Sequence, residues 1–119
     1  MLATTIRSSF SNQGEICLCG SRIFVERPIY EKFKTDFVER VSALKVGDPL
    51  DAATDVGAIV SRQHFDKIMS YIALAREEGG NILCGGRTAE PPASAGDQSL
   101  GGYFIEPTVI EGLPHDCRT

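Results

Sequence analysis

The sequence contains no long hydrophobic run and no export signal. Its apolar stretches, such as 16–19, are only a few residues long, whereas a helix that crosses a membrane needs about 20 apolar residues. Residues 1–7 lack an apolar core of secretory length, and Arg7 follows the apolar residues rather than preceding them. These absences predict a cytoplasmic protein that does not interact with membranes.

The sequence also lacks any cluster of basic residues. Its 12 lysines and arginines are scattered, and 16 aspartates and glutamates bring the formal net charge to -4. Because phosphate backbones and anionic lipids are attracted by concentrated positive charge, nucleic acid is not an expected partner. The length of 119 residues, with 42% hydrophobic content, is typical of one globular domain with a modest core.

Cysteine is present at four positions, but not in the arrangement of a metal site. Cys17 and Cys19 form one close pair, whereas Cys84 and Cys117 are isolated. A structural zinc site needs a second pair at short spacing, so no metal is expected. Without an export signal, reduced thiols are expected rather than a disulfide framework.

Two stretches have the periodicity of amphipathic helices. Between 28 and 45, apolar residues recur every three or four positions with charged residues between them, and Gly47 ends the pattern. The second stretch runs from Ser61, a typical N-cap, to Gly79, which favours helix termination. A weaker helical stretch at 2–10 is followed by turn-forming residues.

Three short segments rich in β-branched and aromatic residues, 22–26, 81–84 and 103–110, predict strands, and the Gly- and Pro-rich segment 85–102 predicts a loop. Strands that alternate with helices favour an α/β fold, a mostly parallel sheet with flanking helices. Because few strands are present and no element closes the chain, 1–119 is expected to be part of a larger domain.

Cys17 follows a glycine turn and lies between the aliphatic residues Ile16 and Leu18. Main-chain amides at a turn are free to donate, so they can stabilise a negative oxygen that forms beside the Cys17 sulfur. A free cysteine is also commonly a small buried hydrophobic residue. The local pattern by itself therefore leaves both a catalytic thiol and a packing residue open.

The segment 10–22 resembles the cysteine signature of the aldehyde dehydrogenase family. Phe10, Gly14, Glu15 and Cys17 stand at the defined positions of that signature, and a pattern spread over a dozen positions is specific. The match continues along nearly the whole chain, at 20–25, 45–49, 57–61, 84–86 and 102–108.

The resemblance implies that 1–119 belongs to the catalytic domain of such an enzyme, with the cofactor domain absent from it. In this family the signature cysteine attacks an aldehyde, a hydride passes to a nicotinamide cofactor, and water releases a carboxylic acid from the thioester. The resemblance therefore implies Cys17, not Cys19, as the nucleophile. It also implies NAD as the cofactor, with NADP not excluded, a small-molecule aldehyde as the substrate, a homo-oligomeric parent enzyme and an inactive isolated chain.

Within the family, residues 12–19 are most similar to the 2-aminomuconic and 2-hydroxymuconic semialdehyde dehydrogenases. Ile16 and Leu18 flank the nucleophile and are expected to form an apolar wall of the substrate pocket, with core packing as the alternative. His64 and Lys67 match a family segment in which a Gln, and a Lys three residues later, reach the adenosine ribose of the cofactor. His64 replaces that Gln, and a solvated helix face is the alternative for both residues.

The resemblance places the general-base Glu, the oxyanion Asn and the glycine-containing cofactor loop of the family before Met1, and a ribose-binding Glu after Thr119. Glu15 belongs to the signature and is not that general base. Two other functions remain open at this point. One is a non-catalytic interaction module, and the other is thiol redox chemistry or metal binding through Cys17 and Cys19.

Overall fold

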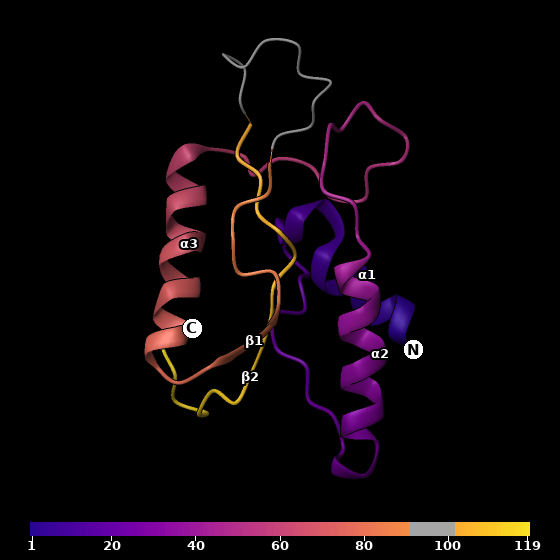
Figure 1. Cartoon of the computed structure of the whole chain (residues 1–119), viewed down its shortest axis with the longest axis vertical. Coiled ribbons are helices and arrows are strands. Elements are labelled where there is room, and N and C mark those ends of the chain that lie inside the picture. Colours follow the sequence, from indigo (N-terminus) through magenta and orange to yellow (C-terminus); the bar gives the residue numbers. More distant parts are fainter. Residues whose placement is uncertain (91–101) are drawn as a thin grey trace.

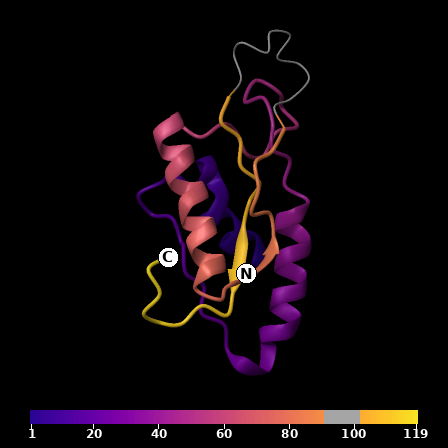
Figure 2. The same ribbon diagram turned by 60° about the vertical axis from the view of Figure 1, so that its left-hand side comes forward.

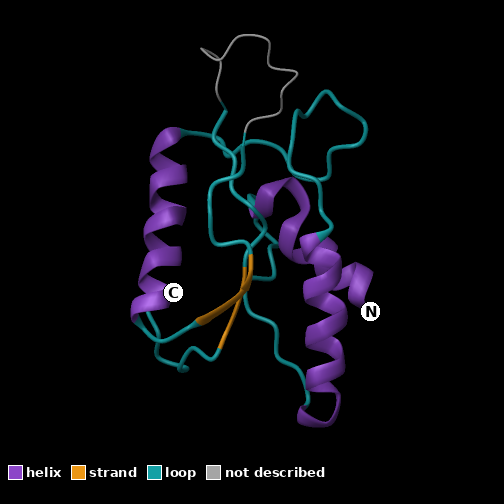
Figure 3. Cartoon of the chain, viewed as in Figure 1, coloured by secondary structure: helices purple, strands orange, loops and turns teal. Residues whose placement is uncertain are grey.

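The computed structural model describes residues 1–90 and 102–119, and much of this chain is loop between short regular elements (Figure 3). The predicted loop at 85–102 therefore lies largely outside the described residues. The regular elements, in chain order, are α1 (Leu2–Phe10), the 3-10 turn η1 (Ser11–Gly14), the 3-10 turn η2 (Arg27–Ile29), α2 (Tyr30–Ser42), α3 (Arg62–Glu77), β1 (Asn81–Cys84) and β2 (Val109–Glu111).

The two strands lie between the two long helices. Figure 1 shows α3 on one side of the β1–β2 pair and α2 on the other, and the rotated view in Figure 2 shows the same order. Helix α1 packs beside α2, where the rings of Phe10 and Phe37 have centroids 6.3 Å apart. None of the helices in the described ranges is long and apolar enough to cross a membrane.

The predicted amphipathic helices are confirmed, with small shifts at their ends. Helix α3 starts after Ser61, whose side-chain oxygen accepts a hydrogen bond from the main-chain N–H of His64 at 3.2 Å. Such a cap satisfies one of the donors left free in the first helical turn. Two residues beyond the helix, Gly79 has a φ of 88°, which glycine adopts without steric cost.

The apolar stripe of each long helix faces the interior. Phe37 and Val41 are buried on α2, and Ile72 and Ala75 are buried on α3. The core beside α3 joins Ile72 to one residue from the loop before α3 and one from the loop before β2, and five half-buried side chains pack around them. The members of this cluster are Ile59, Ile72 and Ile105, with Phe65, Ile68, Met69, Ile82 and Tyr103.

The expectation of a mostly parallel sheet is wrong for the described residues. Strands β1 and β2 pair antiparallel, with Asn81 opposite Glu111. Parallel pairing needs a crossover, commonly a helix, and the described parts of the connection, 85–90 and 102–108, contain none. Within the described chain, parallel pairing is limited to one isolated bridge, between Val46 and Val56.

Two of the predicted strands are also corrected. The segment 22–26 is extended loop, because no strand of the described chain pairs with its main chain. The segment 103–110 forms a strand only from Val109 onward, and its earlier part makes isolated bridges through Tyr103 and Ile105. β-branched and aromatic composition favours extended backbone, but a ladder also requires a partner at the right place.

The carboxylate of Glu111 connects β2 to α2 and β1. It accepts hydrogen bonds from the hydroxyl of Tyr30 at 2.6 Å and the side-chain amide of Asn81 at 3.3 Å, and the ammonium of Lys34 lies at 3.3 Å. The hydrogen bond from Tyr30 is the main cause that lowers the pKa of Glu111 below its usual value, and Lys34 adds to it. The charged carboxylate is therefore the form that this contact favours.

Candidate active site

The cysteine loop, which we define as Ser11–Cys19, reverses the chain after α1. Asn12 and Gln13 have φ values of 50° and 58°, and Gly14 follows with a φ of 78°. A left-handed conformation costs a non-glycine residue about 1 kcal/mol or more, although asparagine tolerates it best. Gln13 is thus held in a strained conformation by contacts elsewhere, a feature that is concentrated at functional sites.

Cys17 lies at the tip of this loop with its thiol exposed. A hydrogen bond of 3.0 Å from the N–H of Cys19 to the carbonyl oxygen of Ile16 closes the turn around it. The thiol of Cys19 instead faces α1, where it donates to the carbonyl oxygen of Ser9 at 3.3 Å. The two cysteines therefore have different environments, and Cys17 has the accessible one.

The two neighbours of Cys17 are not part of the core. Ile16 is 39% exposed and Leu18 is 84% exposed, so neither packs into the core formed by the described residues. They place apolar surface directly beside the thiol. Such a surface suits contact with the apolar part of another molecule.

Two side chains of the loop attach it to a segment more than 40 residues later in the sequence. The amide of Gln13 donates to the carbonyl oxygen of Ala58 at 3.1 Å and accepts from the N–H of Gly57 at 3.3 Å. The carboxylate of Glu15 accepts from the N–H of Val60 at 3.2 Å, and its Oε1 lies 3.5 Å from Nε2 of His64. We call this set of contacts the clasp.

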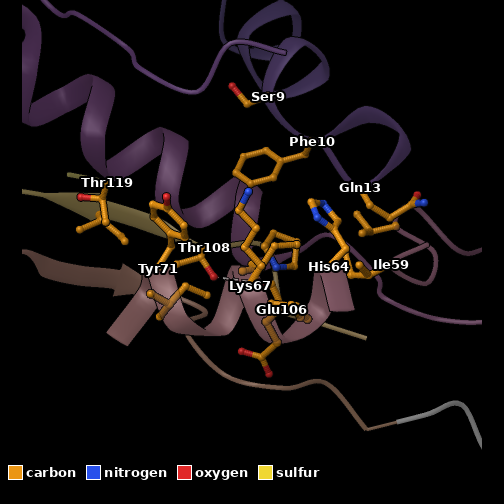
Figure 4. A pocket seen from close by; sticks show the side chains of 16 residues that line it. Ser9, Phe10, Gln13, Ile59, His64, Lys67, Tyr71, Glu106, Thr108 and Thr119 are labelled. Carbon is orange, nitrogen blue, oxygen red and sulfur yellow. Dashed lines mark hydrogen bonds between the residues drawn. The ribbon is translucent and has the colours of Figure 1, made fainter. Parts of the chain in front are cut away.

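A recess of about 400 Å³ lies between the end of α1 and helix α3. Figure 4 shows Phe10 and Gln13 on one side, and His64, Lys67 and Tyr71, all from α3, on the other. Most of the lining is aliphatic or aromatic, with a few polar groups among it. Small-molecule sites commonly combine these two properties.

The structure brings together two of the five residues selected from the sequence. His64 and Lys67 both line the recess, one helical turn apart, as residues at i and i+3 do. Cys17, Ile16 and Leu18 do not line it. In the described part of the chain, no three His, Cys, Asp or Glu side chains gather as a metal site requires.

Sequence reasoning missed the clasp. Gln13 and Glu15 lie in the signature segment, and 57–61 and His64 were noted separately, but no local pattern connects the two regions because they are remote in the chain. Tyr71 was missed as a recess residue for a similar reason, because an aromatic residue on an amphipathic helix is usually explained by packing.

The comparisons with known proteins agree on one family. The family model described as "Aldehyde dehydrogenase family" matches residues 1–119. The 2-aminomuconic semialdehyde dehydrogenase of Danio rerio is 49% identical over 112 residues, which cover 94% of this chain and 23% of the relative. The 2-aminomuconic 6-semialdehyde dehydrogenase of Pseudomonas sp is 43% identical over 118 residues, covering 99% of this chain and 23% of the relative.

Solved structures give the same result. Betaine aldehyde dehydrogenase from Staphylococcus aureus, in complex with NAD+, superposes with a TM-score of 0.88 at 33% identity, over 98% of this chain and 23% of that protein. A 3,6-anhydro-L-galactose dehydrogenase in complex with NADP gives a TM-score of 0.88 at 34% identity, with the same coverage of 98% and 23%. The chain thus spans about a quarter of the length of these relatives. It belongs to the aldehyde dehydrogenase family.

Proposed function

We propose that this chain supplies the nucleophilic thiol and part of the cofactor site of an NAD-dependent dehydrogenase that oxidises an aldehyde, a muconic semialdehyde, to a carboxylic acid. The observation that carries the proposal is the exposed thiol of Cys17 on a strained loop, in a chain of this family. The described elements then form part of a catalytic domain, and the cofactor domain lies outside residues 1–119.

In the proposed reaction the thiolate of Cys17 attacks the carbonyl carbon of the aldehyde. A C–S bond forms, and the carbonyl electron pair moves onto oxygen, which gives a thiohemiacetal. Within the described chain, no acceptor is recorded for the main-chain N–H of Cys17. That N–H is therefore free to donate to the negative oxygen, the arrangement expected of an oxyanion site.

His64 and Lys67 would hold part of the bound NAD, which would supply the acceptor for the hydride of the former carbonyl carbon. The C=O bond then reforms, and the acyl group remains on the sulfur of Cys17 as a thioester. Water adds to the thioester carbon and loses one proton to solvent, the C–S bond breaks, and the carboxylic acid leaves while the sulfur keeps the electron pair of that bond. Cys17 thus returns to the thiolate with which it began.

The recess fits one part of a dinucleotide. Its apolar walls suit a flat ring or the carbon face of a ribose, and the ammonium of Lys67 supplies a positive charge for hydroxyl or phosphate oxygens. His64 adds a ring nitrogen one turn away. Since one solved relative is in complex with NAD+ and another with NADP, both cofactors stay within the proposal.

The choice of a muconic semialdehyde rests on the relatives and on the surface beside the thiol. Proteins that are 43% to 51% identical to this chain carry that substrate in their names. The exposed side chains of Ile16 and Leu18 offer an apolar wall for the unsaturated carbon chain of such a substrate. We propose these two residues as substrate contacts.

Covalent trapping tests the proposal directly. The full-length enzyme is mixed with NAD and a semialdehyde, quenched with acid within one turnover, and digested for mass spectrometry of the peptide that contains Cys17 and Cys19. We expect an acyl group on Cys17 and none on Cys19, which serves as an internal control because both thiols lie on one peptide. Acylation of Cys19, or of neither thiol during active turnover, would overturn the assignment.

A further inference from the structure

The position of Cys17 is not fixed by secondary structure. The loop that carries it lies beyond α1, passes through three consecutive residues at positive φ, and belongs to no strand. A loop of this kind can place its tip in several ways unless other contacts select one. The selecting contacts must therefore be those that the loop makes with the rest of the chain.

The clasp provides such contacts at the bend of the loop and at a position close to Cys17. Gln13 is the strained residue at the bend, and its amide is both donor and acceptor in hydrogen bonds to Gly57 and Ala58. Glu15 lies two residues before Cys17, and its carboxylate reaches Val60 and His64. Its side chain is 19% exposed, so most of it is withdrawn from solvent into this contact.

The clasp also connects the thiol to the helix of the recess. The segment 57–60 leads directly into α3, and His64 lies in the first turn of that helix. The other residue proposed to contact the cofactor, Lys67, follows one turn later and lines the same recess. A contact between Glu15 and His64 therefore joins the nucleophile loop to the side of α3 that faces the cofactor.

We propose that Gln13 and Glu15 are positioning residues that hold the thiol of Cys17 at a fixed place relative to α3. Glu15 acts through Val60 and His64, and Gln13 acts through the main chain at 57–58. The inference rests on the proposed function, since it assigns the clasp to the nucleophile and the cofactor helix of that enzyme. Neither residue touches the reacting atoms.

His64 brings a ring nitrogen to the contact, because its Nε2 lies 3.5 Å from Oε1 of Glu15. The other charged or titratable groups at the recess that His64 lines are Lys67, Tyr71 and Glu106. Glu15 is the only carboxylate recorded within ion-pair distance of His64 among the described residues.

The test compares Glu15→Ala and Gln13→Ala with the parent in the full-length enzyme. Rates are expressed per NAD-binding site, counted by titration with NAD, so that unfolded protein, which binds no NAD, is not counted. Because a displaced nucleophile slows the chemical step, we expect kcat to fall about tenfold or more in each variant. KM for NAD should change less than about twofold in Glu15→Ala, because Glu15 does not line the recess. A role in folding alone would lower the number of titrated sites and leave kcat per site unchanged.

Further variants test the contact of Glu15 itself. Glu15→Gln keeps an oxygen that can accept from Val60 and His64, so it should recover at least about half of the parent kcat. Losses in Glu15→Ala/His64→Ala should be smaller than the product of the single losses, because both substitutions remove the same contact. Asp36→Ala is the matched control, since it removes a carboxylate that pairs with Lys32 within α2, and should leave kcat unchanged.

The outcomes separate this inference from the function on which it rests. A parent-like kcat in both Glu15→Ala and Gln13→Ala, with Cys17→Ser inactive, would overturn the positioning role of the clasp. The assignment of Cys17 as the nucleophile would still hold. Full turnover in Cys17→Ser would overturn the proposed function itself. If Glu15→Ala does not fold, Gln13→Ala decides alone, because its hydrogen bonds are separate from those of Glu15.

Discussion

The cysteine loop and helix α3 carry the two halves of the proposed site, and they are built in opposite ways. The loop contains residues at positive φ and leaves Cys17 and Leu18 exposed. Helix α3 has a capped first turn and buries Ile72 and Ala75. Side-chain hydrogen bonds to the main chain of a segment remote in sequence hold the loop, whereas packing of its apolar residues holds α3.

This difference between the loop and α3 implies that the loop affects reactivity and that α3 affects stability. Burial of apolar surface stabilises α3 whether or not a molecule occupies the recess. The loop buries little, so its conformation contributes little to the free energy of unfolding but sets where the thiol lies. We therefore expect substitutions in the loop to change chemistry and substitutions on the apolar face of α3 to change stability.

Cys17→Ser gives the sharpest contrast and the largest effect. A serine hydroxyl is far less nucleophilic than a thiolate near neutral pH, so kcat/KM for the aldehyde should fall at least about 10³-fold in the full-length enzyme. The free energy of unfolding, measured in urea, should stay within about 0.5 kcal/mol of the parent value, because the side chain is exposed. Cys19→Ser, the matched control, should keep most of the activity.

Phe65→Ala tests the opposite region. Phe65 packs against the core cluster, with its ring 5.9 Å from that of Tyr103, so its removal should lower the free energy of unfolding by about 3 kcal/mol. Urea denaturation measures the loss. The value of kcat per NAD-binding site, counted by titration with NAD, should be nearly unchanged. A large loss of kcat per site without a loss of stability would contradict the expectation that the apolar residues of α3 affect stability and not chemistry.

Lys67→Ala addresses the face of α3 that belongs to the recess. Loss of the ammonium should raise KM for NAD about fivefold, which corresponds to about 1 kcal/mol, and leave the acylation rate little changed. Arg62→Ala removes a cation of the same helix that is paired with Asp66 and does not line the recess, so its KM should match the parent. Equal KM values in the parent and both variants would mean that Lys67 is part of a solvated helix face and does not contact the cofactor.

The smallest effect is expected away from both regions, at the contact of Tyr30 with Glu111. Tyr30→Phe removes a hydrogen bond between half-buried groups and should cost about 0.5 kcal/mol at neutral pH. The pKa of Glu111 is lowered in the fold, so this stabilisation exists above the carboxyl's ordinary pKa of 4.5 and is lost as pH falls through the lower folded value.

The measurement is denaturant unfolding of the parent and of Tyr30→Phe near pH 7 and near pH 3. The difference between the two proteins should shrink at the lower pH, where the carboxylate becomes protonated. Lys34 and Asn81 still contact Glu111 in the variant, so the parent-like part of the pH dependence should persist. A difference that is equal at both pH values would show that the hydroxyl does not act through the charged carboxylate.

The helices and the nucleophile candidate could be predicted because their signals are local. The stripe that includes Phe37 and Val41 repeats at the helical period, and the cap at Ser61 needs only a partner three residues later. The strands were predicted less well. The segment 22–26 has strand composition but no partner in the described chain, and pairing partners are chosen by tertiary contacts.

The sequence by itself determined the candidate nucleophile, Cys17, through the cysteine signature, the two amphipathic helices, and the family to which these features point. Only the tertiary structure decided the antiparallel direction of β1 and β2, the recess that His64 and Lys67 share, and the clasp through Gln13 and Glu15. The physical reason is the sequence separation over which each interaction acts. Periodicity, capping and turn chemistry act over a few residues, whereas a hydrogen bond across 45 residues exists only after packing has brought its ends together.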